Sequence, residues 1–147
     1  MKKRNLILVP VLAMTAVFTV QADNDKPISF DQLPRQAQTF VQEHFSDKEV
    51  SFAKMERDFF TKSYEVILID GSKIEFDKHG DWESIDCRKE EIPQAIVPQE
   101  ILRYVKDKHP TRFIIEIERE RKHYEIQLDN EIEIKFNTKF EVIEYDN

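Results

Sequence analysis

The stretch YEVILIDGSKIEFDKHGDW, residues 64–82, decides the fold of this chain. Apolar residues recur at every second position on both sides of Asp70-Gly71. This period of two is typical of half-buried β-strands joined by a two-residue hairpin turn. His79-Gly80 marks a second turn, before a strand that begins near Trp82. Because these connections are too short for a helical crossover, the sequence predicts an antiparallel meander.

The pattern that begins at residue 64 occurs a second time, beginning at residue 124. The matching segments are Tyr64–Val66 with Tyr124–Ile126, and Ile74–Asp77 with Ile134–Asn137. A segment with the apolar spacing of an amphipathic helix precedes each pattern, starting at Leu33-Pro34 and at Val97-Pro98. The sequence therefore predicts a tandem repeat of a helix and a four-stranded antiparallel meander, with repeats at about residues 30–87 and 92–146.

Alternation along the strands assigns their two faces. The expected strands lie near Val50–Arg57, Tyr64–Ile69, Lys73–Asp77, Trp82–Asp86, Arg112–Glu120, His123–Leu128, Glu131–Asn137 and Phe140–Tyr145. One face is apolar and the other is charged, which predicts an α+β fold with the helices on one face of the sheet. Asp129-Asn130 is the turn signal nearest to Asp70-Gly71 in the second copy, and we expect Asn130 to take the positive-φ position there.

The N-terminus predicts export from the cytoplasm. Three basic residues at positions 2–4 precede an apolar run from Leu6 to Val20, and Val20-Gln21-Ala22 has the pattern of a signal-peptidase cleavage site. The apolar run of about 15 residues is shorter than the roughly 20 that span a bilayer. We expect a signal peptide at residues 1–22 and one domain at residues 23–147. The expected location is the periplasm or the outside of the cell, and the protein is not expected to be integral to a membrane.

The charge of the chain bears on its partners. The sequence has 22 Lys and Arg residues against 29 Asp and Glu residues, a formal net charge of −7, which becomes −10 without the three basic residues of the signal peptide. A surface of this sign repels phosphate backbones and argues against nucleic acid as a partner. It would attract a cationic patch on a protein, and it also keeps an exported protein soluble.

Motifs for catalysis, cofactors and metals are missing from the sequence. The histidines are His44, His79, His109 and His123, and neither an HExxH motif nor a pair of cysteines accompanies them. The segment Asp77–Asp81 lacks the spaced oxygen ligands of a calcium loop and is interpreted as a turn. Two glycines cannot build a phosphate-binding loop. We therefore predict no enzyme, no cofactor and no metal site.

Two other groups of residues have a structural interpretation. Neighbouring carboxylates such as Glu116 and Glu118 are interpreted as a solvated ladder on a strand, with a glycosidase pair as the open alternative. Cys87 is the only cysteine, so it cannot form an internal disulfide. We expect a half-buried apolar thiol, and pairing between molecules remains the alternative.

A candidate docking patch breaks the alternation in the first copy. Ile67 and Ile69 stand where the second copy has the polar Gln127 and Asp129, and Phe59 precedes them in the adjoining hairpin. If the strand parity extends to the hairpin, Phe59, Ile67 and Ile69 form one apolar patch on a charged face, as partner-binding surfaces often do. The alternative is that the N-terminal arm around residues 27–30, or a second copy of the protein, covers these side chains.

Two copies of a helix, a strand, Tyr-Glu-Val/Ile and Ile-x-Phe-Asp/Asn resemble the PepSY-like, β-lactamase-inhibitor-like proteins that Bacteroides-type bacteria export. The resemblance covers about Phe30 to Asp146, and the second copy departs from it by lacking both glycines. It implies a β-lactamase-inhibitor-protein-like fold with tandem units that share one sheet. It does not imply inhibition of a β-lactamase. PepSY relatives are associated with protease inhibition or envelope sensing.

The expected function is that of an exported, non-catalytic protein-binding module, an inhibitor or a regulator of the cell envelope. Its expected partner is a protein of the envelope. Two alternatives remain open: a periplasmic protein that binds a small ligand or a peptide, and a hydrolase without a recognisable site. A deep pocket with converging polar groups would favour either alternative.

Overall fold

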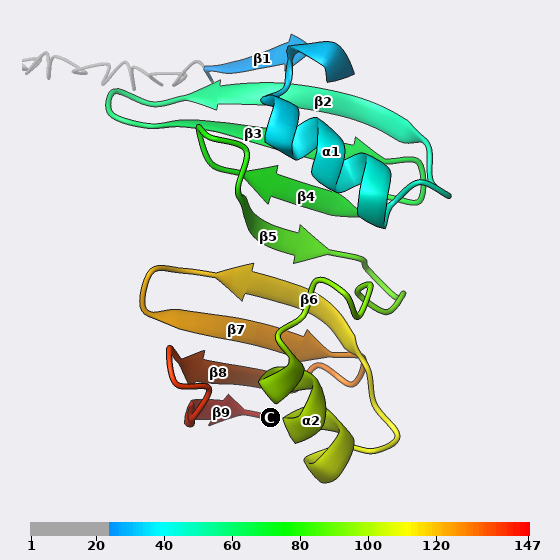
Figure 1. Cartoon of the computed structure of the whole chain (residues 1–147), viewed down its shortest axis with the longest axis vertical. Helices are drawn as coiled ribbons and strands as arrows, with labels where there is room; N and C mark the ends of the chain where they lie inside the picture. Colours follow the sequence, from blue (N-terminus) through cyan, green and yellow to red (C-terminus); the bar gives the residue numbers. More distant parts are fainter. Residues whose placement is uncertain (1–23) are drawn as a thin grey trace, which may run out of the picture.

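The alternating segments form strands in the computed structural model, which describes residues 24–147 (Figure 1). The elements are β1 (Asp25–Ile28), the 3-10 helix η1 (Phe30–Gln32), α1 (Arg35–His44), β2 (Val50–Arg57), β3 (Lys62–Leu68), β4 (Lys73–Phe76), β5 (Trp82–Asp86), α2 (Gln99–Lys108), β6 (Ile114–Arg119), β7 (His123–Leu128), β8 (Glu133–Asn137) and β9 (Val142–Asp146). The strands form one antiparallel sheet in the order β1 to β9. The predicted signal peptide, residues 1–22, lies outside the described residues.

The apolar residues of the strands form one buried face of the sheet, as the alternation predicts. In β3, Tyr64, Val66 and Leu68 are buried. Across the β3–β4 ladder, Tyr64 lies opposite Phe76 and Val66 lies opposite Ile74, both of which are fully buried. Residues directly opposite in an antiparallel pair share a face, so these side chains build one continuous core layer.

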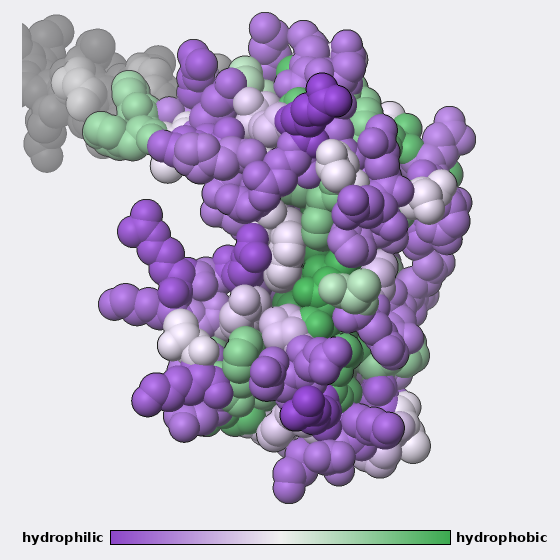
Figure 2. All heavy atoms as spheres, viewed as in Figure 1, coloured by the Kyte–Doolittle hydropathy of each residue, from purple (hydrophilic) through white to green (hydrophobic). Residues whose placement is uncertain are grey.

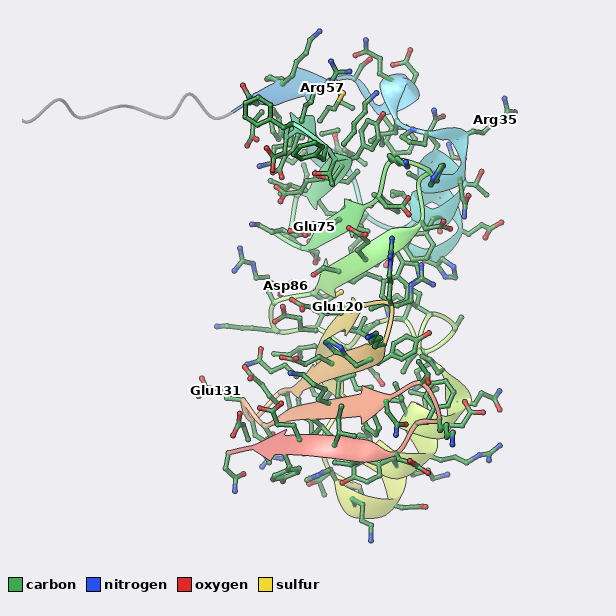
Figure 3. The ribbon with its side chains drawn as sticks, turned by 90° about the vertical axis from the view of Figure 1, so that its left-hand side faces the viewer. Arg35, Arg57, Glu75, Asp86, Glu120 and Glu131 are labelled. Carbon is green, nitrogen blue, oxygen red and sulfur yellow. The ribbon has the colours of Figure 1, made fainter. Side chains whose placement is uncertain are left out.

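Both helices cover this buried face of the sheet (Figures 1 and 3). The Phe40 ring of α1 packs edge-on against Phe76, with 5.7 Å between ring centroids. The Tyr104 ring of α2 packs in the same manner against Phe136, at 5.3 Å. No helix among residues 24–147 lies on the opposite face of the sheet, which we call the outer face.

The predicted repeat organisation is wrong, although the α+β class is right. The chain forms one sheet of nine antiparallel strands with two α-helices, and a tandem repeat of a helix and four strands is not shown. β5 pairs with β6 across the expected boundary, with Ile85 opposite Ile117. β1 is a further strand that pairs with β2, with Ile28 opposite Ala53. The physical reason is that an unpaired strand edge leaves backbone N–H and C=O groups unsatisfied, and joining the edges satisfies them.

Two tight turns require a positive φ angle at one residue. Gly71 has φ +86° and donates its N–H to the Leu68 carbonyl oxygen (2.9 Å). In the turn between β7 and β8, Glu131 has φ +69° and donates its N–H to the Leu128 carbonyl oxygen (2.9 Å). The expectation that Asn130 takes this conformation is therefore wrong. A residue with a Cβ atom occupies a position where glycine is favoured.

In the part of the chain that the structure describes, no helix has both the length and the apolar content needed to cross a bilayer.

Candidate functional site

The predicted docking residue Phe59 lies at the tip of the hairpin between β2 and β3. The Asp58 N–H donates to the Thr61 carbonyl oxygen (2.9 Å), and the Asp58 carboxylate accepts the Phe59 N–H (2.7 Å). This tight loop directs two phenylalanines away from the sheet, because Phe59 and Phe60 are 95% and 98% exposed. We call these two residues the Phe59–Phe60 tip.

The predicted residues Ile67 and Ile69 lie at the other end of β3. Ile67 is half-buried and lies opposite Phe52 of β2, which is 41% exposed. Ile69 is 65% exposed, and its N–H donates to the Glu49 carbonyl oxygen (2.9 Å). Strand parity places these three side chains on the outer face. We call Phe52, Ile67 and Ile69 the isoleucine patch.

The structure brings Ile67 and Ile69 together with Phe52, but it does not bring Phe59 to them. Phe59 and Ile67 are eight residues apart, which corresponds to about 26 Å along a strand at about 3.3 Å per residue. The hypothesis of one patch rested on strand parity, which gives the face of a residue and not its position along the strand. The alternation in β2 was the signal that could have found Phe52, because Phe52 shares its parity with the outward-facing Lys54.

The N-terminal arm, which we considered as a cover for these residues, has another role in the structure. It forms β1 at the edge of the sheet, where Pro27 lies opposite Lys54. Phe59 remains exposed beside it.

Carboxylates dominate the rest of the outer face. Acidic residues lie directly opposite one another in four ladders: Glu65 with Glu75, Asp86 with Glu116, Glu118 with Glu125, and Glu133 with Asp146. Figure 3 shows Glu75 and Asp86 on the side of the sheet away from the helices. Lys135 moderates the repulsion, since its Nζ lies 3.2 Å from Glu125 and 3.1 Å from Glu144. Like charges directly opposite in a sheet are destabilising, so the acidic pairs of this face lower the stability of the folded protein.

Burial and mutual repulsion raise the pKa values of several of these acids. Burial raises the pKa of Glu116 to about 6, and repulsion from Asp86 and Glu118 adds to the effect. Burial, followed by repulsion from Glu65, raises the pKa of Glu75. Burial and then Glu125 raise the pKa of Glu118 in the same way. The raised pKa values indicate that these carboxylates gain less stabilisation from cations than they lose through desolvation and repulsion.

A broad hollow of about 1460 Å³ lies between the β2–β3 hairpin, the β4–β5 turn and the β6–β7 hairpin. Figure 2 shows it as a notch at the left side of the molecule. Charged side chains of both signs line most of it, among them Lys62, Glu75, Lys78, Glu118 and Arg121. Small-molecule pockets are mostly apolar and enclosed, so the breadth and charge of this hollow favour a macromolecular contact.

The segment Asp77–Asp81 is a turn, as its sequence indicates. The Asp77 carboxylate accepts the N–H groups of His79 (2.8 Å) and Asp81 (3.0 Å), which fixes the chain between β4 and β5. Within residues 24–147, no group of three or more His, Cys, Asp or Glu side chains is arranged to hold a metal ion.

Cys87 is more deeply buried than the sequence predicts. It is 2% exposed and belongs to the core. Burial raises the pKa of its thiol to about 11, so the thiol stays protonated at neutral pH. A buried, protonated thiol is a poor nucleophile and a poor candidate for a disulfide between molecules.

The chain is similar to known proteins over most of its length. Residues 62–144 match the family described as "Putative beta-lactamase-inhibitor-like, PepSY-like". A solved structure from Bacteroides thetaiotaomicron, described as a "putative calcium-regulated periplasmic protein", is 50% identical, with a TM-score of 0.82. The similarity covers 84% of this chain and 97% of that chain.

Two solved structures from Bacteroides vulgatus are also similar. One is described as a "putative periplasmic protein from DUF2874 family" and is 48% identical, with a TM-score of 0.83, covering 86% of this chain and 99% of that chain. The other is described as a "putative periplasmic protein of unknown function" and is 34% identical, with a TM-score of 0.79, covering 84% and 99%. No curated protein matches the chain.

Proposed function

The chain belongs to the exported PepSY-like, β-lactamase-inhibitor-like family, and we propose that it is a non-catalytic protein-binding module of the cell envelope. The Phe59–Phe60 tip is the anchor of its docking surface. The isoleucine patch, at the other end of β3, is a second contact for the same partner.

The exposure of the Phe59–Phe60 tip carries this proposal. Two adjacent phenylalanines that are 95% and 98% exposed gain nothing from the fold of the described residues. Burying one such side chain against a partner is worth about 1.5–3 kcal/mol. Aromatic residues are enriched among those that contribute most to interfaces. The tip also borders the hollow, of which Phe60 forms part of the wall.

The alternatives of a small-ligand carrier and a hydrolase have less support. The hollow is wide and charged, whereas a site for a small ligand encloses most of the ligand surface. The carboxylates Glu116 and Glu118 lie on the outer face of the sheet. Burial, followed by repulsion from Asp86 for Glu116 and from Glu125 for Glu118, raises their pKa values, and no enclosed substrate cleft is needed to explain them.

The description of one relative as calcium-regulated raises the question of calcium. The described residues do not fit a calcium site. The carboxylate of Asp77, which begins the segment closest to a calcium loop, already accepts two backbone N–H groups. No metal-holding cluster of carboxylates lies within residues 24–147. Direct calcium binding is therefore not part of the proposed function.

Photo-crosslinking in the native cell tests the proposal. A photo-reactive phenylalanine analogue replaces Phe59, which leaves the fold intact because the side chain is exposed. The matched control replaces Lys108, an exposed residue of α2 that does not line the hollow. We expect a discrete protein adduct from position 59 and none from position 108.

A second comparison separates the tip from the isoleucine patch. A Phe59→Ser, Phe60→Ser variant should lose the crosslinked partner, and an Ile67→Thr, Ile69→Thr variant should bind it more weakly. The proposal fails if irradiation gives no adduct at position 59. It also fails if the tip variant still co-purifies with the same protein in the same amount as the wild type.

A further inference from the structure

The two edges of the sheet differ in how they are protected from pairing with another chain. An edge strand presents a row of backbone N–H and C=O groups that can pair with a further strand. β1 limits such pairing, because it contains Pro27, which has no N–H, and the charged Lys26. β9 contains no proline, glycine or lysine. Among residues 24–147, no strand pairs with the outer edge of β9.

Exposed apolar side chains on β9 favour contact with another chain. Val142, Ile143 and Tyr145 are 38%, 56% and 42% exposed, and every residue of β9 is exposed. The Tyr145 ring stacks on His109 at the end of α2, with 5.9 Å between ring centroids. This contact fixes the orientation of the Tyr145 ring, which lies at the sheet edge on the face that the helices cover.

The β8–β9 ladder assigns a face to every residue of β9 except Ile143, which has no partner because the register shifts there. Tyr145 lies opposite the buried Ile134, so it faces the helices. Glu144 lies opposite Lys135, and Asp146 lies opposite Glu133, so both acids face the outer side. Lys135 lies 3.1 Å from Glu144, whereas the residue directly opposite Asp146 is another acid. The edge therefore has an apolar side and an acidic side, with the excess of negative charge at Asp146.

This charge pattern disfavours pairing of β9 with a second copy of itself. Two β9 strands related by a two-fold axis would run antiparallel. Registers that keep the outer faces aligned place Glu144 opposite Glu144, Glu144 opposite Asp146, or Asp146 opposite Asp146 of the other copy. Like charges directly opposite are destabilising, and the chain as a whole carries a net charge of −7. A strand with basic residues at alternate positions complements the same edge.

We propose that β9 accepts an extended segment of another protein as a tenth strand, in which Lys or Arg residues alternate with apolar residues. The basic residues lie against Glu144 and Asp146, and the apolar residues lie beside Val142 and Tyr145. Backbone hydrogen bonds supply affinity in this mode of recognition, and alternate side chains supply specificity. Figure 1 places β9 at the opposite end of the sheet from the β2–β3 hairpin, so this surface does not depend on the Phe59–Phe60 tip.

Titration of the full chain with labelled peptides tests the proposal. One peptide alternates Val and Lys, a second alternates Val and Glu, and a third has the composition of the first with all its Val residues before its Lys residues. We expect the alternating basic peptide to bind more tightly than either of the others. Its binding should slow hydrogen exchange of the backbone amides in residues 142–146.

Two matched variants locate the binding site. Asp146→Lys replaces one of the two acids at this edge and should raise the Kd of the alternating basic peptide by about threefold to tenfold, as for the loss of one or two surface ion pairs. Asp25→Lys makes the same charge change on β1, and it should leave the Kd within about twofold.

Several results would overturn the proposal. The first is that the alternating basic peptide does not bind, or binds no more tightly than the peptide whose Val and Lys residues stand in separate blocks. The second is that Asp146→Lys and Asp25→Lys change the Kd equally. The third is that the peptide leaves hydrogen exchange in residues 142–146 unchanged. Slow exchange of these amides before any peptide is added would also overturn it. Dilution would then tell whether a second copy, whose effect depends on concentration, or the residues before position 24 occupy the edge.

Discussion

Gly71 and Glu131 adopt the same backbone conformation with different side chains, with φ angles of +86° and +69°. Glycine adopts positive φ without strain, whereas a residue with a Cβ atom is strained there by about 1–2 kcal/mol. A Cβ atom at Gly71 would lie 3.9 Å from the nearest atom, the Arg88 Nε, so space does not limit a substitution. The two positions therefore isolate the backbone contribution to stability.

We expect Glu131→Gly to stabilise the protein by about 0.5–1 kcal/mol, and Gly71→Ala to destabilise it by about 1 kcal/mol. Both effects are smaller than the full backbone strain, because glycine also raises the entropy of the unfolded chain. Urea unfolding measures both free energies. A loss of stability in Glu131→Gly would show that the Glu131 side chain contributes more than its strained backbone costs.

Glu116 makes the stability of the protein depend on pH. Its folded pKa of about 6 is raised above the ordinary value of 4.5, so the folded state holds the proton more tightly than the unfolded state. Stability is therefore higher below this range, and it falls as the pH rises from about 4.5 to about 6. We expect Glu116→Gln to raise stability at pH 7 by about 0.5 kcal/mol, a value reduced for screening by water, and to flatten this part of the pH profile.

Thermal unfolding of the wild type and Glu116→Gln between pH 4 and pH 8 checks this expectation. Glu43→Gln, at an exposed position of α1, is the control for loss of one negative charge. If the two variants shift Tm equally at pH 7, the effect comes from net charge and not from the neighbours of Glu116.

At the scale of the elements, the β5–β6 ladder joins the two halves of the sheet through three residue pairs. Asp86 opposite Glu116 is one of them and is repulsive. Trp82 reinforces the junction: the guanidinium of Arg119 lies 4.4 Å from its ring centroid, and the Arg119 Nη2 donates to the Trp82 carbonyl oxygen (2.7 Å). A contact between an aromatic ring and a cation thus compensates for a short ladder.

Trp82→Ala should destabilise the protein by about 3–5 kcal/mol, because Trp82 is 9% exposed and packs in the core. Arg119→Ala should cost less, and a double-mutant cycle should give a coupling of about 0.5–2 kcal/mol between the two residues. The free energies come from urea unfolding of the four proteins. A coupling near zero would mean that Arg119 and Trp82 stabilise the junction independently.

The elements also show what the sequence could predict. Period-two alternation identified the buried residues of β3 and β4, because burial on one face selects apolar residues at alternate positions. β1 was missed, since it is short and contains Pro27, which removes a backbone donor and weakens the strand signal. Alternation could not give the β5–β6 pairing, because it reports which face of a strand is buried and not which edges meet; only the family resemblance implied a shared sheet. The separation of Phe59 from Ile67 was missed for a similar reason, because strand parity gives the face on which a residue lies and not its position along the strand.

At the scale of the whole molecule, repulsion on the outer face should make stability depend on salt. The chain has a net charge of −7, and acidic residues lie opposite one another in four ladders of this face. Salt at about 0.1–0.2 M reduces the range of such repulsion to about 8–10 Å. We expect Tm to rise as NaCl increases from about 0.02 M to about 0.2 M.

Thermal unfolding in NaCl, with sucrose solutions as the uncharged control, measures this effect. A Tm that falls with salt would show that the ion pairs of Lys54 and Lys135 contribute more to stability than the repulsion between acids removes.

The order of the strands affects how an exported chain acquires its structure. Every strand from β2 to β9 pairs with the strand that precedes it in the sequence. The connections from β1 to β2 and from β5 to β6 pass through a helix, and the others are short turns. Folds built from such local contacts form quickly. A chain that emerges from a membrane N-terminus first can therefore add one hairpin at a time to the sheet already formed, without waiting for distant residues. Its growing edge is exposed at each stage until the next strand pairs with it.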